Sequence, residues 1–126
     1  MDKYTIIEVF KKLDFIDQKN LTKALPEYGN LFEYIYQLDA SSDTANNMTD
    51  SDLILFRNLH YLKCNRYFTD VSLGQLTRLI SLNCGWNTNF TDASLCKLTQ
   101  LIKLYYGVGH KFTNLCLSKI KYTHIY

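Results

Sequence analysis

The chain has 126 residues, of which 47% are hydrophobic and 14% aromatic, and its formal net charge at neutral pH is +2. This composition is typical of one folded domain, because a chain of this size buries roughly two-thirds of its unfolded surface. The small net charge makes no electrostatic case for a general nucleic-acid binder, which needs a clustered basic face. We therefore expect no nucleic-acid partner.

The sequence contains no apolar run long enough to span a membrane, and its N-terminus has no basic stretch followed by an apolar run, as a signal peptide would. We expect an intracellular protein, cytoplasmic by default, with no membrane partner and with reduced thiols. The cysteines lack the CxxC spacing of zinc and redox centres, so we expect no metal and no cofactor. They are Cys64, Cys84, Cys96 and Cys116.

Residues 1–14 are the first predicted element, a helix that covers one end of the domain. Ile6, Ile7 and Phe10 fall near helical spacing, and charged residues take the opposite side. Residues 15–47 carry a degenerate form of a repeat that becomes regular later, since Leu38 and Ala40 have the spacing of Leu82 and Cys84. We expect a polar loop from residue 41 to residue 47.

From residue 48 onward the repeat is regular. Phe68, Phe90 and Phe112 are each followed by Thr and stand 22 residues apart. Leucines recur at fixed distances after the first two of them: Leu73, Leu76, Leu79, Leu82, and then Leu95, Leu98, Leu101, Leu104. A fixed period of roughly 20–29 residues indicates a stack of coils. We expect about five coils, with repeats at 48–67, 68–89 and 90–111 and a truncated repeat at 112–126. The repeat at 48–67 is two residues shorter than the next, and we place that deletion in a turn after Cys64.

The stretch Leu79-x-x-Leu82-x-Cys84-x-x-Asn87-x-x-Phe90-Thr91-Asp92-x-x-Leu95 resembles a leucine-rich repeat, with its pattern LxxLxLxxN/C. The Thr-Asp-x-x-Leu continuation is similar to the cysteine-containing, F-box-type subclass found in substrate-recognition arms of ubiquitin ligases, with shorter units. The resemblance implies an α/β solenoid that has a parallel sheet on its concave side and short helices on its convex side. It covers residues 48–120 well and 15–47 weakly. Gly109 and Tyr106 depart from the pattern.

The residues themselves support the same arrangement. Side chains two apart on a strand face one way, so equivalent positions stack coil on coil in two inward ladders. The ladders are Leu38, Leu62, Leu82, Leu104 and Ala40, Cys64, Cys84, Tyr106. Cys64 and Cys84 are then either two small buried hydrophobes or a disulfide. Asn87 is expected at the turn after its strand. Thr69, Thr91 and Thr113 fit helix N-caps, and Asp70 and Asp92 fit the first helical turns.

Aromatic and basic residues gather at the outward positions of neighbouring coils, where polar residues are the norm. Trp, Tyr and Arg are enriched at binding hot spots. We therefore expect a protein partner on the concave face, at Tyr61, Lys63, Arg66, Asn83, Trp86, Lys103 and Tyr105. Arg66 and Trp86 are predicted to share one row. Trp86 has an alternative placement, folded over a loop to fill space beside Gly85.

Three further functions were weighed against this interaction module. The histidines His60, His110 and His124 occupy different coil positions and suggest no catalytic set, so we expect no enzyme. A structural protein could instead self-associate as a homodimer through an apolar C-terminal edge formed by Leu117, Ile120, Tyr122, Ile125 and Tyr126. A ligase adaptor would need the F-box that Leu25-Pro26-Glu27 faintly resembles, but Gly29-Asn30 falls in the middle of its helix.

Overall fold

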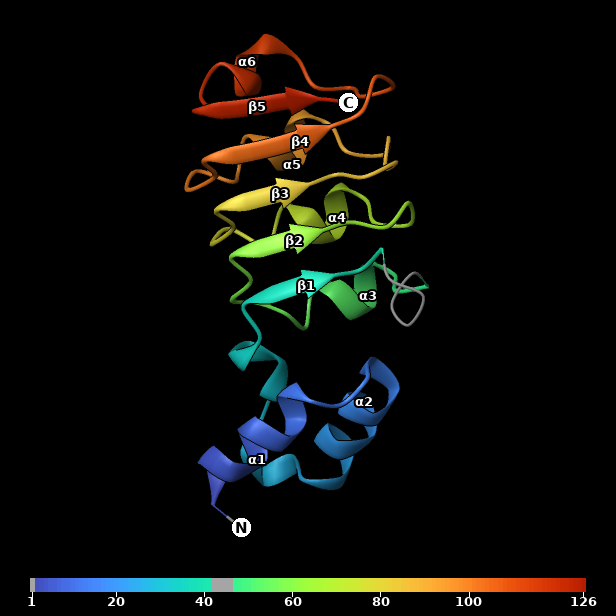
Figure 1. Cartoon of the computed structure of the whole chain (residues 1–126), viewed down its shortest axis with the longest axis vertical. Helices are drawn as coiled ribbons and strands as arrows, with labels where there is room; N and C mark the ends of the chain where they lie inside the picture. Colours follow the sequence, from blue (N-terminus) through green and yellow to red (C-terminus); the bar gives the residue numbers. More distant parts are fainter. Residues whose placement is uncertain (1, 42–46) are drawn as a thin grey trace.

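The structure is a computed structural model that describes residues 2–41 and 47–126. Its centre is one five-stranded sheet in which every strand pairs in parallel with the next strand along the chain. The strands are β1 (Gln37–Asp39), β2 (Tyr61–Lys63), β3 (Ser81–Asn83), β4 (Lys103–Tyr106) and β5 (Tyr122–Ile125). Figure 1 shows them stacked in chain order. The chain is therefore α/β, as predicted. The predicted loop at 41–47 lies outside the described residues except at its two ends.

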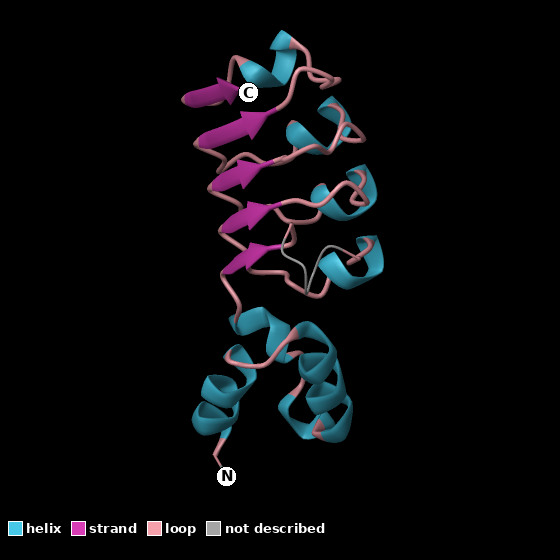
Figure 2. Ribbon diagram, turned by 45° about the vertical axis from the view of Figure 1, so that its right-hand side comes forward, coloured by secondary structure: helices cyan, strands magenta, loops and turns pink. Residues whose placement is uncertain are grey.

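A short helix stands between each strand and the next. These helices are α3 (Asp50–Leu53), α4 (Asp70–Leu73), α5 (Asp92–Leu95) and α6 (Asn114–Leu117). Strands line one side of the stack and helices the other (Figure 2). The predicted N-caps are confirmed, because the hydroxyls of Thr69, Thr91 and Thr113 each accept a hydrogen bond from the first turn of the helix that follows.

Helices cover the β1 end of the stack (Figure 1). They are α1 (Lys3–Lys11), α2 (Phe15–Ala24) and the 3-10 helices η1 (Pro26–Tyr28) and η2 (Leu31–Tyr34). Phe10 and Phe56 each pack on Phe32, with ring centroids 4.9 and 4.8 Å away, and all three rings are buried. The helical end thus extends to Tyr34, beyond the predicted limit at residue 14. No helix in the described part of the chain has the length and apolarity needed to cross a bilayer.

The predicted inward ladder of leucines is confirmed by the strand register. Leu38 pairs with Leu62, Leu62 with Leu82, and Leu82 with Leu104, and the last three are almost fully buried. Beside this ladder lie Ala40, Cys64, Cys84 and Tyr106, all buried. Cys64 and Cys84 are free thiols, and burial raises the pKa of Cys84 to about 12. They act as small hydrophobes, the first of the two alternatives.

Carboxylates on the helical side tie each coil to the next, which the sequence reading missed. Asp50 accepts hydrogen bonds from the Thr69 backbone N–H at 2.9 Å, the Thr69 hydroxyl at 2.5 Å and the Ser72 hydroxyl at 2.6 Å. The same contacts recur in later coils, from Thr91 and Ser94 to Asp70 and from Thr113 to Asp92. Each Thr that caps one helix therefore also donates to the first residue of the helix before it.

A disulfide joins the last two helical segments. Cys116 occupies the position of Ser72 and Ser94 in its coil and is bonded to Cys96, with Cα atoms 5.2 Å apart. The expectation that all thiols are reduced is therefore wrong for this pair. The two cysteines hold different positions in their coils, so the repeat pattern alone does not predict that they lie close together.

We predict that Asp50→Asn and Asp92→Asn each make stability less sensitive to acid. Burial acts to raise the pKa of Asp50, but hydrogen bonds from Ser72 and Thr69 outweigh it and lower the pKa. Hydrogen bonds from Thr113 lower the pKa of Asp92. A carboxylate with a lowered folded pKa stabilises the fold above its unfolded pKa of about 3.9, and this contribution is lost as pH falls through the folded pKa.

Urea unfolding at pH 7 and at pH 3 measures this effect. Each variant should be less stable than the wild type at pH 7 and should lose less stability between the two pH values. If both variants lose as much stability as the wild type on acidification, the coil-to-coil carboxylate bonds do not contribute as described.

Candidate functional site

The outward side chains of the strands form two parallel rows, which we call the sheet face. One row is Gln37, Tyr61, Ser81, Lys103 and Tyr122, and the other is Asp39, Lys63, Asn83, Tyr105 and His124. Five of the seven residues predicted to bind a partner therefore share this face. Tyr61 is 46% and Tyr105 37% exposed, and both line a shallow hollow of about 480 Å³. The sheet face thus offers two half-exposed phenol rings among polar neighbours.

Arg66 and Trp86 lie beyond the strands, in the turns that follow β2 and β3. Asn65 and Asn87 are equivalent, because each buried side-chain amide donates to the carbonyl of the first residue of its repeat: Asn65 to Met48 at 2.9 Å and Asn87 to Phe68 at 2.8 Å. Asn65 therefore does not match Gly85, and the prediction that Arg66 and Trp86 share one row is wrong. The two-residue deletion falls between Cys64 and Asn65, so residues 85 and 86 have no counterpart in the shorter coil.

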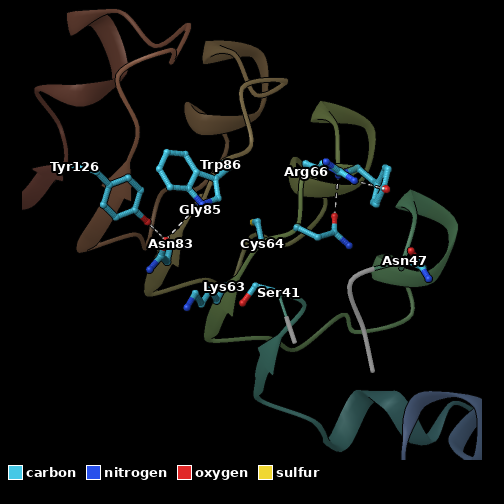
Figure 3. A pocket seen from close by; sticks show the side chains of 11 residues that line it. Ser41, Asn47, Lys63, Cys64, Arg66, Asn83, Gly85, Trp86 and Tyr126 are labelled. Carbon is cyan, nitrogen blue, oxygen red and sulfur yellow. Dashed lines mark hydrogen bonds between the residues drawn. The ribbon is translucent and has the colours of Figure 1, made fainter. Parts of the chain in front are cut away.

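The shorter turn leaves a pocket of about 760 Å³ between its neighbours, which we call the Trp86 pocket (Figure 3). Residues 63–67 line it from the shorter coil. Asn83, Gly85, Trp86 and Tyr126 line it on one side, and Ser41 and Asn47 lie on the other. Of the predicted binding residues, Lys63 and Asn83 therefore belong both to this pocket and to the sheet face.

Gly85 directs the chain so that Trp86 stays in solvent. It has a φ of +58°, and a Cβ added there would lie 3.2 Å from the Cys64 carbonyl oxygen, so glycine fits this place best. The Gly85 N–H donates to Asn83 Oδ1 at 2.9 Å, which fixes the turn. Trp86 is 87% exposed, so the alternative in which it fills space beside Gly85 is wrong.

Tyr126 completes the aromatic side of the pocket. Its backbone N–H donates to the Tyr106 carbonyl at 3.0 Å, its hydroxyl donates to Asn83 Oδ1, and its ring centroid lies 6.3 Å from that of Trp86. Burial raises the pKa of the Tyr126 phenol, which therefore stays a neutral donor at neutral pH. Tyr126 was predicted only as part of a self-association edge, and nothing in the repeat pattern placed it beside Trp86.

The charged side chains among the described lining residues of the pocket are both cations, Lys63 and Arg66. The Arg66 guanidinium donates to the Tyr67 hydroxyl at 3.2 Å and lies 5.2 Å from the centroid of the Tyr67 ring. Asp39 stands next to Lys63 in the sheet register. A hydrogen bond from Ser41 lowers the pKa of Asp39, with a smaller contribution from the charge of Lys63. The pocket is therefore cationic and aromatic, with one carboxylate near its rim.

The residues of the predicted self-association edge separate into three groups. Leu117 and Ile120 are half-buried against the core. Tyr122 and Ile125 on β5 are 53% and 50% exposed, and within the described chain β5 pairs only with β4. Tyr126 belongs to the Trp86 pocket. The exposed edge thus consists mainly of Tyr122 and Ile125.

Each histidine lies beside an aromatic ring in a different part of the stack. The ring centroids are 5.2 Å apart for His60 and Tyr36, 4.6 Å for His110 and Tyr106, and 5.7 Å for His124 and Tyr105. Within residues 2–41 and 47–126, no three histidine, cysteine or acidic side chains gather as metal ligands would.

No model of a known protein family matches the chain, and no curated protein matches it either. The arrangement can hold aromatic and cationic groups in fixed positions against a ligand. Sequence reasoning found most of these groups but missed the pocket, although the two-residue deletion was a signal for it.

We predict that Gly85→Ala destabilises the protein by about 1–2 kcal/mol, because an alanine in the left-handed region is strained and its Cβ would crowd the Cys64 carbonyl. Gly107→Ala is the matched control, since Gly107 has the same place in the next coil and a Cβ there would meet its nearest atom at an ordinary 3.6 Å. Urea unfolding measures both effects. Equal effects would contradict the special role of Gly85 in presenting Trp86.

Proposed function

We propose that this chain is a short leucine-rich-repeat solenoid that works as a non-catalytic protein-interaction module. The proposal is supported by the agreement between the repeat and the register: residues 22 apart in sequence, such as Leu82 and Leu104, lie side by side in the sheet. The F-box alternative has less support. After Leu25 the chain forms two 3-10 helices separated by Gly29, whose φ is +71°, where an F-box would have a longer amphipathic helix.

The partner binds across the sheet face and the neighbouring Trp86 pocket. The observation that carries this proposal is the exposure of Tyr61, Tyr105 and Trp86 on parts of the molecule that share Lys63 and Asn83. Large aromatic side chains on a surface mark interaction sites, and tyrosine and tryptophan dominate binding hot spots. Strands and hydrogen-bonded turns hold these side chains, which lowers the entropy cost of binding.

No catalytic group and no cofactor has a part in this proposal. An intracellular location remains a prediction. The disulfide between Cys96 and Cys116 does not favour it, because disulfides are typical of oxidising compartments.

We predict that a Tyr61→Ala/Tyr105→Ala double variant weakens partner binding by about 2–4 kcal/mol while the protein stays folded, because both rings are half-exposed and lie outside the core. The partner is first captured from the native source with the wild-type chain. Its affinity for both proteins is then measured by calorimetry. Val71→Ala is the control, since Val71 is 68% exposed on α4, on the opposite side. An unchanged affinity in the double variant would count against the sheet face.

A second candidate function, self-association through β5, is favoured by one observation. β5 lies at the edge of the sheet, and two of its apolar side chains are half-exposed: Tyr122 in an outward row, and Ile125 on the inner side beside Tyr106. An exposed strand edge invites pairing with another strand, and pairing with the same edge of a second copy closes as a twofold dimer.

We predict a homodimer at tens of micromolar, measured by light scattering during size exclusion. Tyr122→Lys and Ile125→Lys should shift it toward monomer, because a lysine on each copy brings like charges together and removes apolar contact. Val71→Lys, with its added charge on the helical side, is the control and should remain dimeric. A monomeric wild type removes this candidate.

A further inference from the structure

We propose that the Trp86 pocket binds an acidic segment of the protein partner, in which an aspartate or glutamate lies within a few positions of an apolar side chain. This inference rests on the proposed function and deepens it, because it assigns a ligand chemistry to one part of the interaction surface.

Two cations line the pocket for the acidic side chains of such a segment. Lys63 is exposed at the end of β2 and Arg66 is exposed in the turn that follows, and both line the pocket from the same short coil. Contact with Tyr67 holds the Arg66 guanidinium in place and uses only part of its donor capacity. Charge-assisted hydrogen bonds from lysine and arginine to carboxylates are about twice as strong as neutral ones.

The apolar side chain of the segment would cover Trp86 and Tyr126. In Figure 3 these two rings lie together on one side of the pocket, and Arg66 lies on the other. Trp86 is 87% exposed and Tyr126 46%, so a ligand that covers both rings removes a large apolar surface from water. Lys63 lies beside Asn83, nearer the rings. The separation of the two rings from Arg66 predicts a ligand with two chemically different groups side by side.

A donor for the peptide backbone lies on the aromatic side of the pocket. Asn83 Oδ1 already accepts from the Gly85 N–H and from the Tyr126 hydroxyl. The side-chain NH₂ group of Asn83 can therefore donate to the ligand, and a peptide carbonyl is a suitable acceptor. The pocket volume of about 760 Å³ is within the range of pockets that enclose small ligands, roughly 300–1,000 Å³.

The charge distribution favours an acidic peptide over a nucleic acid. Single-stranded nucleic acids bind along a continuous basic groove with aromatic stacking platforms. Here Asp39 pairs in register with Lys63 and would repel a phosphate backbone that runs onto the sheet face. The two positive charges of the pocket can be neutralised by one or two carboxylates, whereas a run of phosphates would bring more negative charge than the pocket can neutralise.

A random peptide library displayed on phage, panned against the whole chain, tests the inference. We expect the selected peptides to be enriched in aspartate or glutamate near leucine, phenylalanine or another large apolar residue. A selected peptide without tryptophan is then titrated, and binding is followed by the fluorescence of Trp86, the only tryptophan of the chain. Its emission should shift to the blue when the peptide covers the ring.

Matched variants assign the binding to the pocket. Lys63→Gln and Arg66→Gln should each weaken the peptide about tenfold, the effect of losing one charge-assisted contact. Lys103→Gln removes an exposed cation of the sheet face outside the pocket and should change the affinity little. A peptide with glutamine in place of its acid should bind the wild type about as weakly as the acidic peptide binds Arg66→Gln. Thermal unfolding checks that the variants are folded.

The inference would be overturned if no peptide is selected, or if the selected peptides are neutral or basic. It would also be overturned if Lys63→Gln and Arg66→Gln bind the peptide as tightly as the wild type does. A fourth contrary result is that an oligothymidylate of about ten nucleotides binds more tightly than the peptide. The last result would assign the pocket to nucleic acid. Failure here is distinguishable from failure of the proposed function. If partner binding depends on Tyr61 and Tyr105 but not on Lys63 or Arg66, only the proposed pocket ligand is wrong. If a peptide binds the pocket but partner binding does not depend on the sheet face, the proposed interaction surface is wrong.

Discussion

The parallel register between neighbouring strands is the constraint on which the rest of the structure depends. Leu62, Leu82 and Leu104 are paired in sequence order, and each is almost fully buried. A strand has a side-chain period of two, so a slip of one residue would turn this ladder outward and bury its polar neighbours. The same register sets the rows of the sheet face, so the core and the candidate binding surface are fixed by one set of hydrogen bonds.

Polar side chains hold the register where strands cannot. On the helical side, carboxylates such as Asp70 accept from the threonine that caps the next helix, and in the turns Asn87 donates to the carbonyls of Asn65 and Phe68. These groups lie at the same interval as the leucines, so each coil carries its own attachment to its neighbour. Buried backbone groups in the turns are satisfied in this way.

Spacing alone predicted the strands, the inward ladder and the helix N-caps, because each depends on contacts that recur at one period. It missed the carboxylate bonds between coils, which recur with that period, and the other features that it missed involve departures from it. The match between Asn65 and Asn87 rests on their hydrogen bonds to Met48 and Phe68, which spacing alone does not show. The Cys96–Cys116 disulfide and the place of Tyr126 join positions that are not equivalent, so no repeat could indicate them.

The two-residue deletion in the second coil has a consequence for how such a surface changes over evolution. β2 keeps its full pairing with β1 and β3 although the turn after it is shorter. The length of a turn can therefore change without changing the strand pairing. Loss of residues from a turn leaves a hollow at that coil, and gain of residues fills it. A chain of this kind can gain or lose a surface hollow by small insertions and deletions, without any substitution among its buried leucines.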